Sequence, residues 1–263
     1  MNENALILLF KCCKIKGRTI FGKEIKIIMT KIRFVSGAWL KLIAMISMLV
    51  DHVNKALIYP NLVSNHGFLA TVSDLFDIIG RIAFPLFCFM LVEGYFKTRS
   101  RKRYLFNLLL FGMISEVPFD MFTTASFFNM NWNNVMFTLA LVLITIWCID
   151  VLKEKMQKLP KALWYLVSLI IVAVMCIVAM FLSLDYEHHA ILIGYFFYLF
   201  HDAPIFAILF GYVSMFKEPW ALLGFGLTLT YNGERGKQNK MLNYWFYPVH
   251  LLILGILRMC LRI

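Results

Sequence analysis

"AWLKLIAMISMLVDHVNKALI" (residues 38–58) is the stretch that decides the fold of this chain. At a rise of about 1.5 Å per residue, a helix of this length spans about 30 Å, the thickness of the hydrocarbon core of a bilayer. The same run carries Asp51 and His52 side by side, where lipid offers no hydrogen-bond partners. It therefore predicts a membrane-spanning helix with polar groups in its second half.

Apolar segments of this kind recur along the 263-residue chain, which is 61% hydrophobic and only 16% charged. Because lipid cannot satisfy backbone polar groups, long apolar segments are expected to be helices. They predict an all-α fold: one polytopic membrane helical bundle, over residues 38–259, of about 8–10 transmembrane or partly spanning helices. The sixth to eighth segments are short enough to be tilted, broken or re-entrant. The segments are 38–58, 75–96, 104–122, 134–152, 163–183, 190–200, 204–216, 219–231 and 241–259.

Lys and Arg are distributed unevenly between the two sides of this bundle. If the N-terminus is inside, the inner segments hold 21 Lys and Arg residues and the outer segments hold 4. Cytoplasmic loops carry the excess of basic residues, so the N-terminus is expected to be cytoplasmic. The net charge of +11 is thus explained by topology, and no nucleic-acid partner is expected. The basic inner segments are the residues up to Lys41, 97–103, 153–161 and 232–240.

Residues 1–37 form a basic leader. Its apolar stretch "ALILLF" is too short to span a bilayer, and no small-residue cleavage site follows, so a signal peptide is not expected. Met29 lies just before the first long apolar segment. One hypothesis is that translation begins at Met29.

Charged side chains inside apolar segments are costly and usually face the interior of the bundle, where they mark a function. In the expected topology, several unrelated segments bring such groups to the outer half of the membrane, which predicts a shared polar cavity. Glu93 lies nearer the cytoplasm, and Asp185 follows the fifth segment. His250 is expected near mid-depth, and the residues expected in the outer half are Asp51, His52, Asp77, Arg81, Glu116 and Asp120.

In two pairs of these residues, the spacing along the chain predicts how the side chains lie. Asp77 and Arg81 are four residues apart, so they are expected to form an ion pair on one helix face, with a structural or a functional role. Glu116 and Asp120 have the same spacing but like charge. One of them is expected to be protonated, or both to be held by Arg81 and a histidine.

His52 is the natural general base, because a neutral imidazole accepts a proton near pH 7. Successive residues on a helix point about 100° apart, so Asp51 is expected to be a packing anchor or to pair with Arg81. The partner that orients His52 is expected to come from another helix, with Glu116 and Asp120 as candidates.

Several motifs are absent. The chain has no Gly-x-Ser-x-Gly, His-Glu-x-x-His, P-loop or Rossmann fingerprint. Its six cysteines are scattered without metal-ligand spacing, so neither a metal site nor a disulfide framework is expected.

With these residues laid out, the chain resembles the TraX family, whose founding members are conjugation proteins that N-acetylate pilin. The resemblance covers roughly residues 38–258 and rests on blocks in a fixed order. The blocks are "LKLIAMISMLVDH" (40–52), "GRIAFPLFCFMLVEGYFKTRSRKRYLFNLLLFGMISEVPFD" (80–120), "NNVMFTLAL" (133–141), "DY" (185–186), "YNGERG" (231–236) and "FYPVHLLIL" (246–254).

The resemblance implies an acetyltransferase of the bacterial cytoplasmic membrane that uses acetyl-CoA. It implies His52 as the catalytic residue, with Asp51 beside it. Glu116 and Asp120 match the family blocks, and either of them is expected to orient the imidazole. The residues after "DY" depart from the family pattern, which leaves the acceptor open: a peptide N-terminus, a glycan or a small molecule. The binding residues that it implies are Arg81, Glu93, Asn133, Asp185, Arg235, Tyr247 and His250.

Two functions therefore compete. In the first, an acyl-CoA-dependent transferase, His52 deprotonates an acceptor, and Arg235 and the basic loops attract the CoA phosphates. In the second, a proton-coupled transporter or flippase, Asp51, His52 and Glu116 form a proton site. Binding of acyl-CoA distinguishes them.

Overall fold

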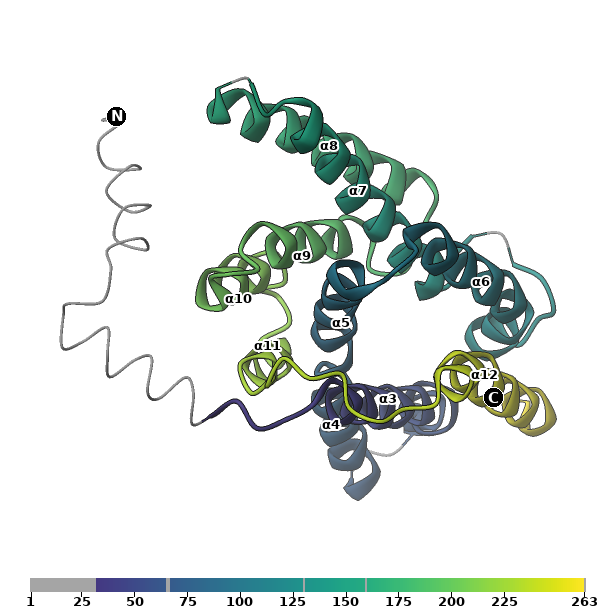
Figure 1. Ribbon diagram of the computed structural model, residues 1–263. Coiled ribbons are helices and arrows are strands. Elements are labelled where there is room, and N and C mark those ends of the chain that lie inside the picture. The colour runs from purple at the N-terminus through teal and green to yellow at the C-terminus, as the bar shows by residue number, and fades with distance from the viewer. Residues whose placement is uncertain (1–31, 65–66, 130, 159, 263) are drawn as a thin grey trace.

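The computed structural model describes residues 32–64, 67–129, 131–158 and 160–262. Within these ranges the chain is built from helices without a named β-strand, so the predicted all-α fold is confirmed (Figure 1). Two isolated parallel bridges, Val35 to Tyr231 and Asn133 to Leu184, connect loops. Met29 and most of the basic leader lie outside the described residues.

The helices follow the predicted apolar segments. In chain order they are α3 (Gly37–Val53), α4 (Phe68–Gly80), α5 (Ala83–Lys97), α6 (Arg101–Thr124), α7 (Val135–Lys155), α8 (Lys161–Phe181), α9 (Glu187–Leu199), α10 (Pro204–Val213), α11 (Ala221–Thr228) and α12 (Lys240–Leu261).

Among the described residues, six helical stretches are long and apolar enough to cross a membrane, and the chain is a multi-pass membrane protein. The second of these stretches, Phe68–Lys97, consists of α4 and α5 with a break at Arg81 and Ile82. Its start lies seven residues before the predicted start at 75. That prediction was wrong because polar residues between 68 and 74 interrupt the apolar run. The short segments are confirmed as the short helices α9, α10 and α11.

The first apolar segment changes its helix type immediately after His52. α3 ends at Val53, a π-helical turn follows over Asn54–Ile58, and a 3₁₀ turn follows over Tyr59–Ser64. Single π-helical turns within longer helices occur frequently at functional sites. Here the turn is fixed by a buried reciprocal pair: Asn54 Nδ2 donates to the Ser73 carbonyl at 2.9 Å, and Ser73 Oγ donates to Asn54 Oδ1 at 2.8 Å.

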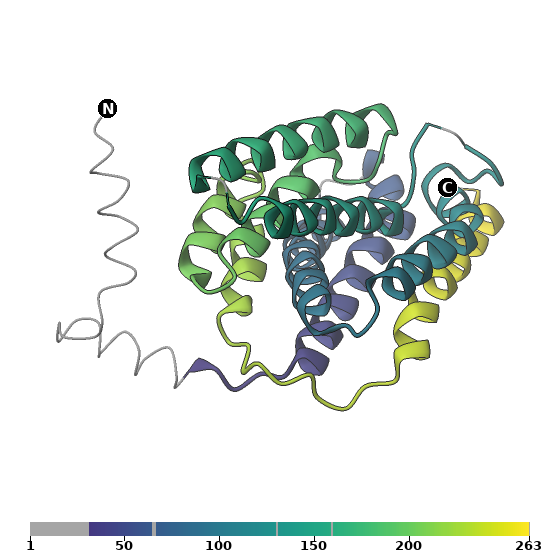
Figure 2. The ribbon, with the colours of Figure 1, turned by 45° about the horizontal axis from the view of Figure 1, so that its top comes forward.

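Helix α5 lies at the centre of the bundle, with α3, α7, α9 and α11 around it (Figure 1). Its buried side chains include Leu86, Cys88 and Val92. Helix α12 returns from the far end of the chain and lies along α6 (Figure 2). The C-terminal helix is therefore brought beside the first half of the bundle.

Contacts between loops define one end of the bundle, called here the basic end. The Gly37 amide donates to the Glu234 carbonyl at 2.9 Å, and Lys97 Nζ donates to the Gly233 carbonyl at 2.8 Å. Arg101 pairs with Asp150 near the end of α7 at 2.9 Å. The segments predicted to share one side of the membrane thus lie together, and the turn at 182–186 lies at the opposite end, beside Asn133.

Candidate functional site

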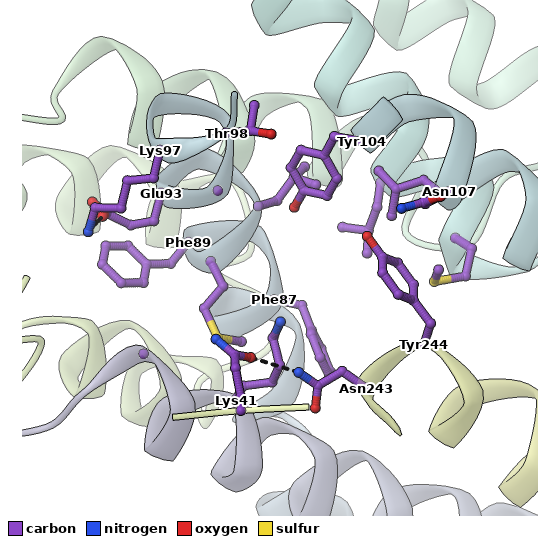
Figure 3. A pocket seen from close by; sticks show the side chains of 18 of the residues that line it. Lys41, Phe87, Phe89, Glu93, Lys97, Thr98, Tyr104, Asn107, Asn243 and Tyr244 are labelled. Carbon is purple, nitrogen blue, oxygen red and sulfur yellow. Dashed lines mark hydrogen bonds and ion pairs between the residues drawn. The ribbon is translucent and has the colours of Figure 1, made fainter. Parts of the chain in front are cut away.

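A cavity of about 710 Å³ opens at the basic end and extends into the bundle between α3, α5, α6 and α12. In Figure 3, Lys41 and Asn243 lie on one wall, Glu93 and Lys97 on a second, and Tyr104, Asn107 and Tyr244 on a third. The start of α7 and the segment 231–238 complete the lining. The cavity is large enough for an extended ligand to enter the membrane domain from the basic end.

One face of α3 forms a wall of this cavity. Lys41, Met45 and Met48 line it, at the 4- and 3-residue spacing that places side chains on one helix face. His52 continues the same stripe, since 11 residues at about 100° each leave an offset of only about 20° from Lys41. The stripe therefore runs from a charged residue at the mouth to His52, one turn beyond the last lining residue.

Helix α12 contributes a matching stripe. Asn243, Phe246 and Tyr247 line the cavity, and His250 follows one turn after Phe246. Neither histidine itself lines the cavity as it stands. The cavity-facing stripes of α3 and α12 nevertheless lead to the same place, because each is followed by a histidine one turn beyond the deep end of the cavity.

The two histidines are in direct contact. His52 Nδ1 lies 2.8 Å from His250 Nε2, and the rings are stacked with an interplanar angle of 10°. His250 Nδ1 lies 2.6 Å from the Phe246 carbonyl oxygen. A carbonyl can only accept, so Nδ1 of His250 carries the proton and its Nε2 is the acceptor in the neutral ring.

This chain of contacts assigns the tautomer of His52. Its Nδ1 donates to His250, so the lone pair of the neutral ring is on Nε2. Nε2 has no hydrogen-bond partner within the part of the chain that the structure describes. His52 is thus oriented with a free basic nitrogen, and its partner comes from another helix as predicted. The partner is His250; the predicted pairing with Glu116 or Asp120 was wrong, because Glu116 contacts Asn134 and Asp120 contacts the Asn129 amide, and neither contacts His52.

Aromatic rings enclose the histidine pair. Phe122 of α6 packs against His52 with ring centroids 4.8 Å apart, and Phe246 stacks on His250 at the same centroid distance. Tyr247 packs edge-on against His250. These rings restrict water, and a hydrogen bond in such a medium is stronger than in bulk solvent.

Asp51 pairs with Lys55, not with Arg81. Lys55 Nζ lies 2.7 Å from Asp51 Oδ2, one turn away, while Asp51 Oδ1 is buried without a hydrogen-bond partner among the described residues. A Cβ added to Gly80 would lie 2.5 Å from Asp51 Oδ1, so α4 packs directly on this carboxylate. The prediction that Asp51 is a packing anchor fits this contact.

Arg81 lies in the break between α4 and α5. It donates to Asp77 at 2.9 Å, so the predicted ion pair is confirmed. Its Nε also lies 3.1 Å from Glu218 Oε2, in the loop between α10 and α11. Arg81 therefore connects two parts of the fold near the end opposite the mouth.

The two carboxylates of α6 contact neighbouring backbone and amide groups. Glu116 accepts a short hydrogen bond from Asn134 Nδ2. Asn134 is fully buried and caps α7 by accepting from the Met136 amide at 3.0 Å. Asp120 accepts from the Asn129 amide at 2.8 Å through Oδ2, and its Oδ1 is buried without a partner among the described residues.

Asn133 and Asp185 join two loops at the end opposite the mouth. Asn133 Nδ2 donates to the Leu182 carbonyl at 2.7 Å, and the Asp185 amide donates to the Asn133 carbonyl at 3.0 Å. Burial raises the pKa of Asp185 to about 6, although Lys55 nearby opposes the shift. Ser183 and Tyr186 have positive φ angles of 46° and 62°, a conformation that costs free energy in non-glycine residues and clusters at functional sites.

The mouth of the cavity is strongly basic. Its described lining contains five Lys and Arg side chains and one carboxylate, Glu93. Glu93 is already neutralised by Lys97 Nζ at 2.8 Å and contacts His201 Nε2 at 2.8 Å. The remaining basic side chains have no ion-pair partner among the described residues. They are Lys41, Arg99, Arg103 and Arg235.

With this geometry established, comparison with known proteins places the chain in a family. The family model described as "TraX protein" matches residues 36–258. The chain belongs to the TraX family. It is also 30% identical over 248 residues to the "Probable fimbrial assembly protein FimC, serogroup H1" of Dichelobacter nodosus, a match that covers 85% of this chain and 96% of that protein. No solved structure matches.

Within the TraX blocks, the structure brings together residues that are far apart in the chain. His52 in the first block and His250 in the last are separated by 198 residues and share a hydrogen bond. Tyr247 and Arg235 both line the cavity, as does Glu93. Arg81 and Asn133 do not line it; they connect loops and helix ends at the other end of the bundle.

Sequence reasoning missed the roles of two residues of this site. Lys41 was counted with the basic leader, although its spacing of four and seven residues from Met45 and Met48 could have placed it on the cavity face. Asn134 precedes an apolar run, the position of a helix N-cap. Among the described residues, no group of three His, Cys, Asp or Glu side chains could hold a metal ion.

Proposed function

We propose that this TraX protein is an acyltransferase that uses acyl-CoA, most simply acetyl-CoA, with His52 as its general base. The observation that carries the proposal is the hydrogen-bond chain from His52 through His250 to the Phe246 carbonyl, one helical turn beyond the deep end of a cavity with a basic mouth. It leaves Nε2 of His52 as a free base with a fixed orientation.

The reaction balances with groups of this chain and two substrates. Nε2 of His52 takes the proton from the acceptor amine or hydroxyl, which attacks the thioester carbonyl carbon. The carbon–sulfur bond then breaks, and the CoA thiolate takes the proton back from the His52 imidazolium. His250 positions His52 and stabilises that cation by accepting from Nδ1–H.

Charge supports CoA as the donor. Phosphate groups are bound by Arg and Lys through charge-assisted hydrogen bonds, and the described lining of the cavity has an excess of four positive charges. The aliphatic and aromatic residues deeper in the cavity, such as Met48, Leu139 and Phe246, suit the pantetheine arm and a short acyl group.

The same charges indicate how the protein is oriented in the membrane. Basic loops remain in the cytoplasm, so the basic end is proposed to face the cytoplasm of a bacterial inner membrane, where acyl-CoA is available. The acceptor would then approach the histidines from the opposite end, past Asp51, Glu116, Asp120 and Asp185. The name of the FimC relative suggests an acceptor that belongs to fimbrial assembly.

A direct test uses the purified protein in lipid nanodiscs with acetyl-CoA and a panel of peptide amines, glycans and hydroxyl compounds, with release of the CoA thiol as the readout. His52→Ala is expected to bind acetyl-CoA like the wild type but to release CoA about 10²–10⁴-fold more slowly. Trp39→Ala, a lipid-exposed residue of the same helix, is the matched control. Failure of the wild type to bind acetyl-CoA at millimolar concentration would instead favour proton-coupled transport, measured by proton flux in liposomes.

A further inference from the structure

Lys41 is a cation without a counterion inside the cavity. It lies on the cavity face of α3, is only partly exposed, and has neither an ion pair nor a hydrogen bond among the described residues (Figure 3). Arg235 lines the same cavity, so the two positive charges repel each other across it. Lys41 is partly buried and Arg235 is exposed at the mouth. A partly buried cation that faces a second positive charge is unfavourable unless an anion joins them.

The position of Arg235 is fixed by the protein itself. The segment 231–236 crosses the mouth and is tied to the start of α3: the Asn232 amide donates to the Val35 carbonyl at 3.0 Å, and the Gly37 amide donates to Glu234 at 2.9 Å. Gly236 has a positive φ of 70° and lies against Ser36, where a Cβ would come within 2.6 Å of Ser36 Oγ. The backbone that carries Arg235 is therefore fixed at the mouth, within reach of a ligand that enters the cavity.

The spacing of Lys41 from His52 matches the length of one part of CoA. Eleven residues of α-helix rise about 16 Å. The pantetheine arm has twelve bonds between its sulfur and the oxygen that carries the diphosphate, equivalent to four peptide residues, or about 14 Å when extended. A thioester beside His52 thus places the diphosphate at the level of Lys41.

We propose that Lys41 and Arg235 together hold the diphosphate of the acyl donor, and so set how deeply the thioester enters. This assignment rests on the proposed function, and it makes Lys41 a binding residue for the phosphate groups. The shared chemistry is that of a phosphate anion, which a phospholipid headgroup could also supply, so the experiment distinguishes the two sources.

The test measures the affinity of the intact protein in phosphatidylcholine nanodiscs for three probes: CoA, dephospho-CoA and pantetheine. Dephospho-CoA keeps the diphosphate and lacks only the 3′-phosphate, whereas pantetheine lacks both. Lys41→Gln and Arg235→Gln are each expected to weaken CoA and dephospho-CoA about tenfold or more and to leave pantetheine unchanged, because each loses a charge-assisted hydrogen bond. Lys102→Gln, on the same end but outside the cavity lining, is the control.

Each outcome decides something. If Lys41→Gln binds CoA as well as the wild type does, the assignment is overturned. If Lys41→Gln weakens the binding of phosphatidylglycerol added to the nanodiscs but not the binding of CoA or dephospho-CoA, the two cations bind a lipid headgroup and the assignment is also overturned. If the wild type binds none of the three probes, the proposed function itself fails, whatever the variants do.

Discussion

Gly224 of α11 allows this helix to pack against the break between α4 and α5, and its replacement by alanine tests that packing. A Cβ at this position would lie 2.5 Å from the Ile82 carbonyl oxygen and 3.1 Å from its carbonyl carbon. These atoms belong to the backbone next to Arg81, and backbone atoms cannot rotate away from a contact as a side chain can. The helices must separate by about 0.9 Å to restore the 3.4 Å of ordinary contact.

The expected magnitude follows from two opposing effects. Overpacking of this kind costs about 1–3 kcal/mol, while a helical Gly→Ala change returns about 0.5–1 kcal/mol. Gly226, in the same helix, has nothing within 4 Å of its added Cβ, so Gly226→Ala keeps only the favourable effect. The two variants should differ by about 2 kcal/mol in the free energy of unfolding, or roughly 4–8 °C in Tm for a chain of this size.

The assay is thermal unfolding of both variants and the wild type in one detergent. Gly224→Ala should have the lowest Tm, and Gly226→Ala should equal or exceed the wild type. Equal Tm values for the two variants would refute the close packing of α11 on Ile82.

Three further predictions concern the site and its supports. His250→Ala should lower kcat about 10–100-fold without changing KM for acetyl-CoA, and His250→Gln should recover part of this loss because its amide oxygen can accept from His52; equal kcat values for the two variants would contradict the positioning role. Asn54→Ala should lower the free energy of unfolding by about 1–3 kcal/mol through its buried pair with Ser73, whereas the exposed Asn61→Ala should change it by less than about 0.5 kcal/mol in chemical denaturation. Burial raises the pKa of Asp185 to about 6, so the folded state binds the proton of this carboxyl group more tightly than the unfolded state does. The Tm of the wild type should therefore fall relative to that of Asp185→Asn as the pH rises from about 4 to 7. Parallel Tm curves for the two proteins would rule this out.

Local features of the fold could be predicted from the sequence. Apolar length predicted the long helices, because a bilayer fixes both their length and their hydrogen bonding. The Asp77–Arg81 ion pair was predictable since its partners are one turn apart on one helix. The start of α4 at Phe68 was missed, because polar residues precede its apolar part and packing against α3 overrides that local signal.

The candidate site depends on contacts that sequence spacing does not contain. The partner of His52 is 198 residues away, on a helix brought back beside α6 by the course of the whole chain. Glu116 and Asp120 were reasonable partners by depth in the membrane, but Asn134 and the Asn129 amide hold them. Depth alone places polar groups at one level without deciding which of them face each other.

The central claim is that Nε2 of His52 is a free base at the point where the acyl group of a bound donor ends. Bromoacetyl-CoA tests it without knowledge of the acceptor, because a nucleophilic nitrogen beside the acyl group displaces bromide and keeps the label. The label would be located by peptide mass spectrometry of the purified protein, with and without excess CoA. The predicted result is modification of the peptide that contains His52, prevented by CoA and absent in His52→Ala; a label on another side chain, or one that CoA does not prevent, would contradict the account.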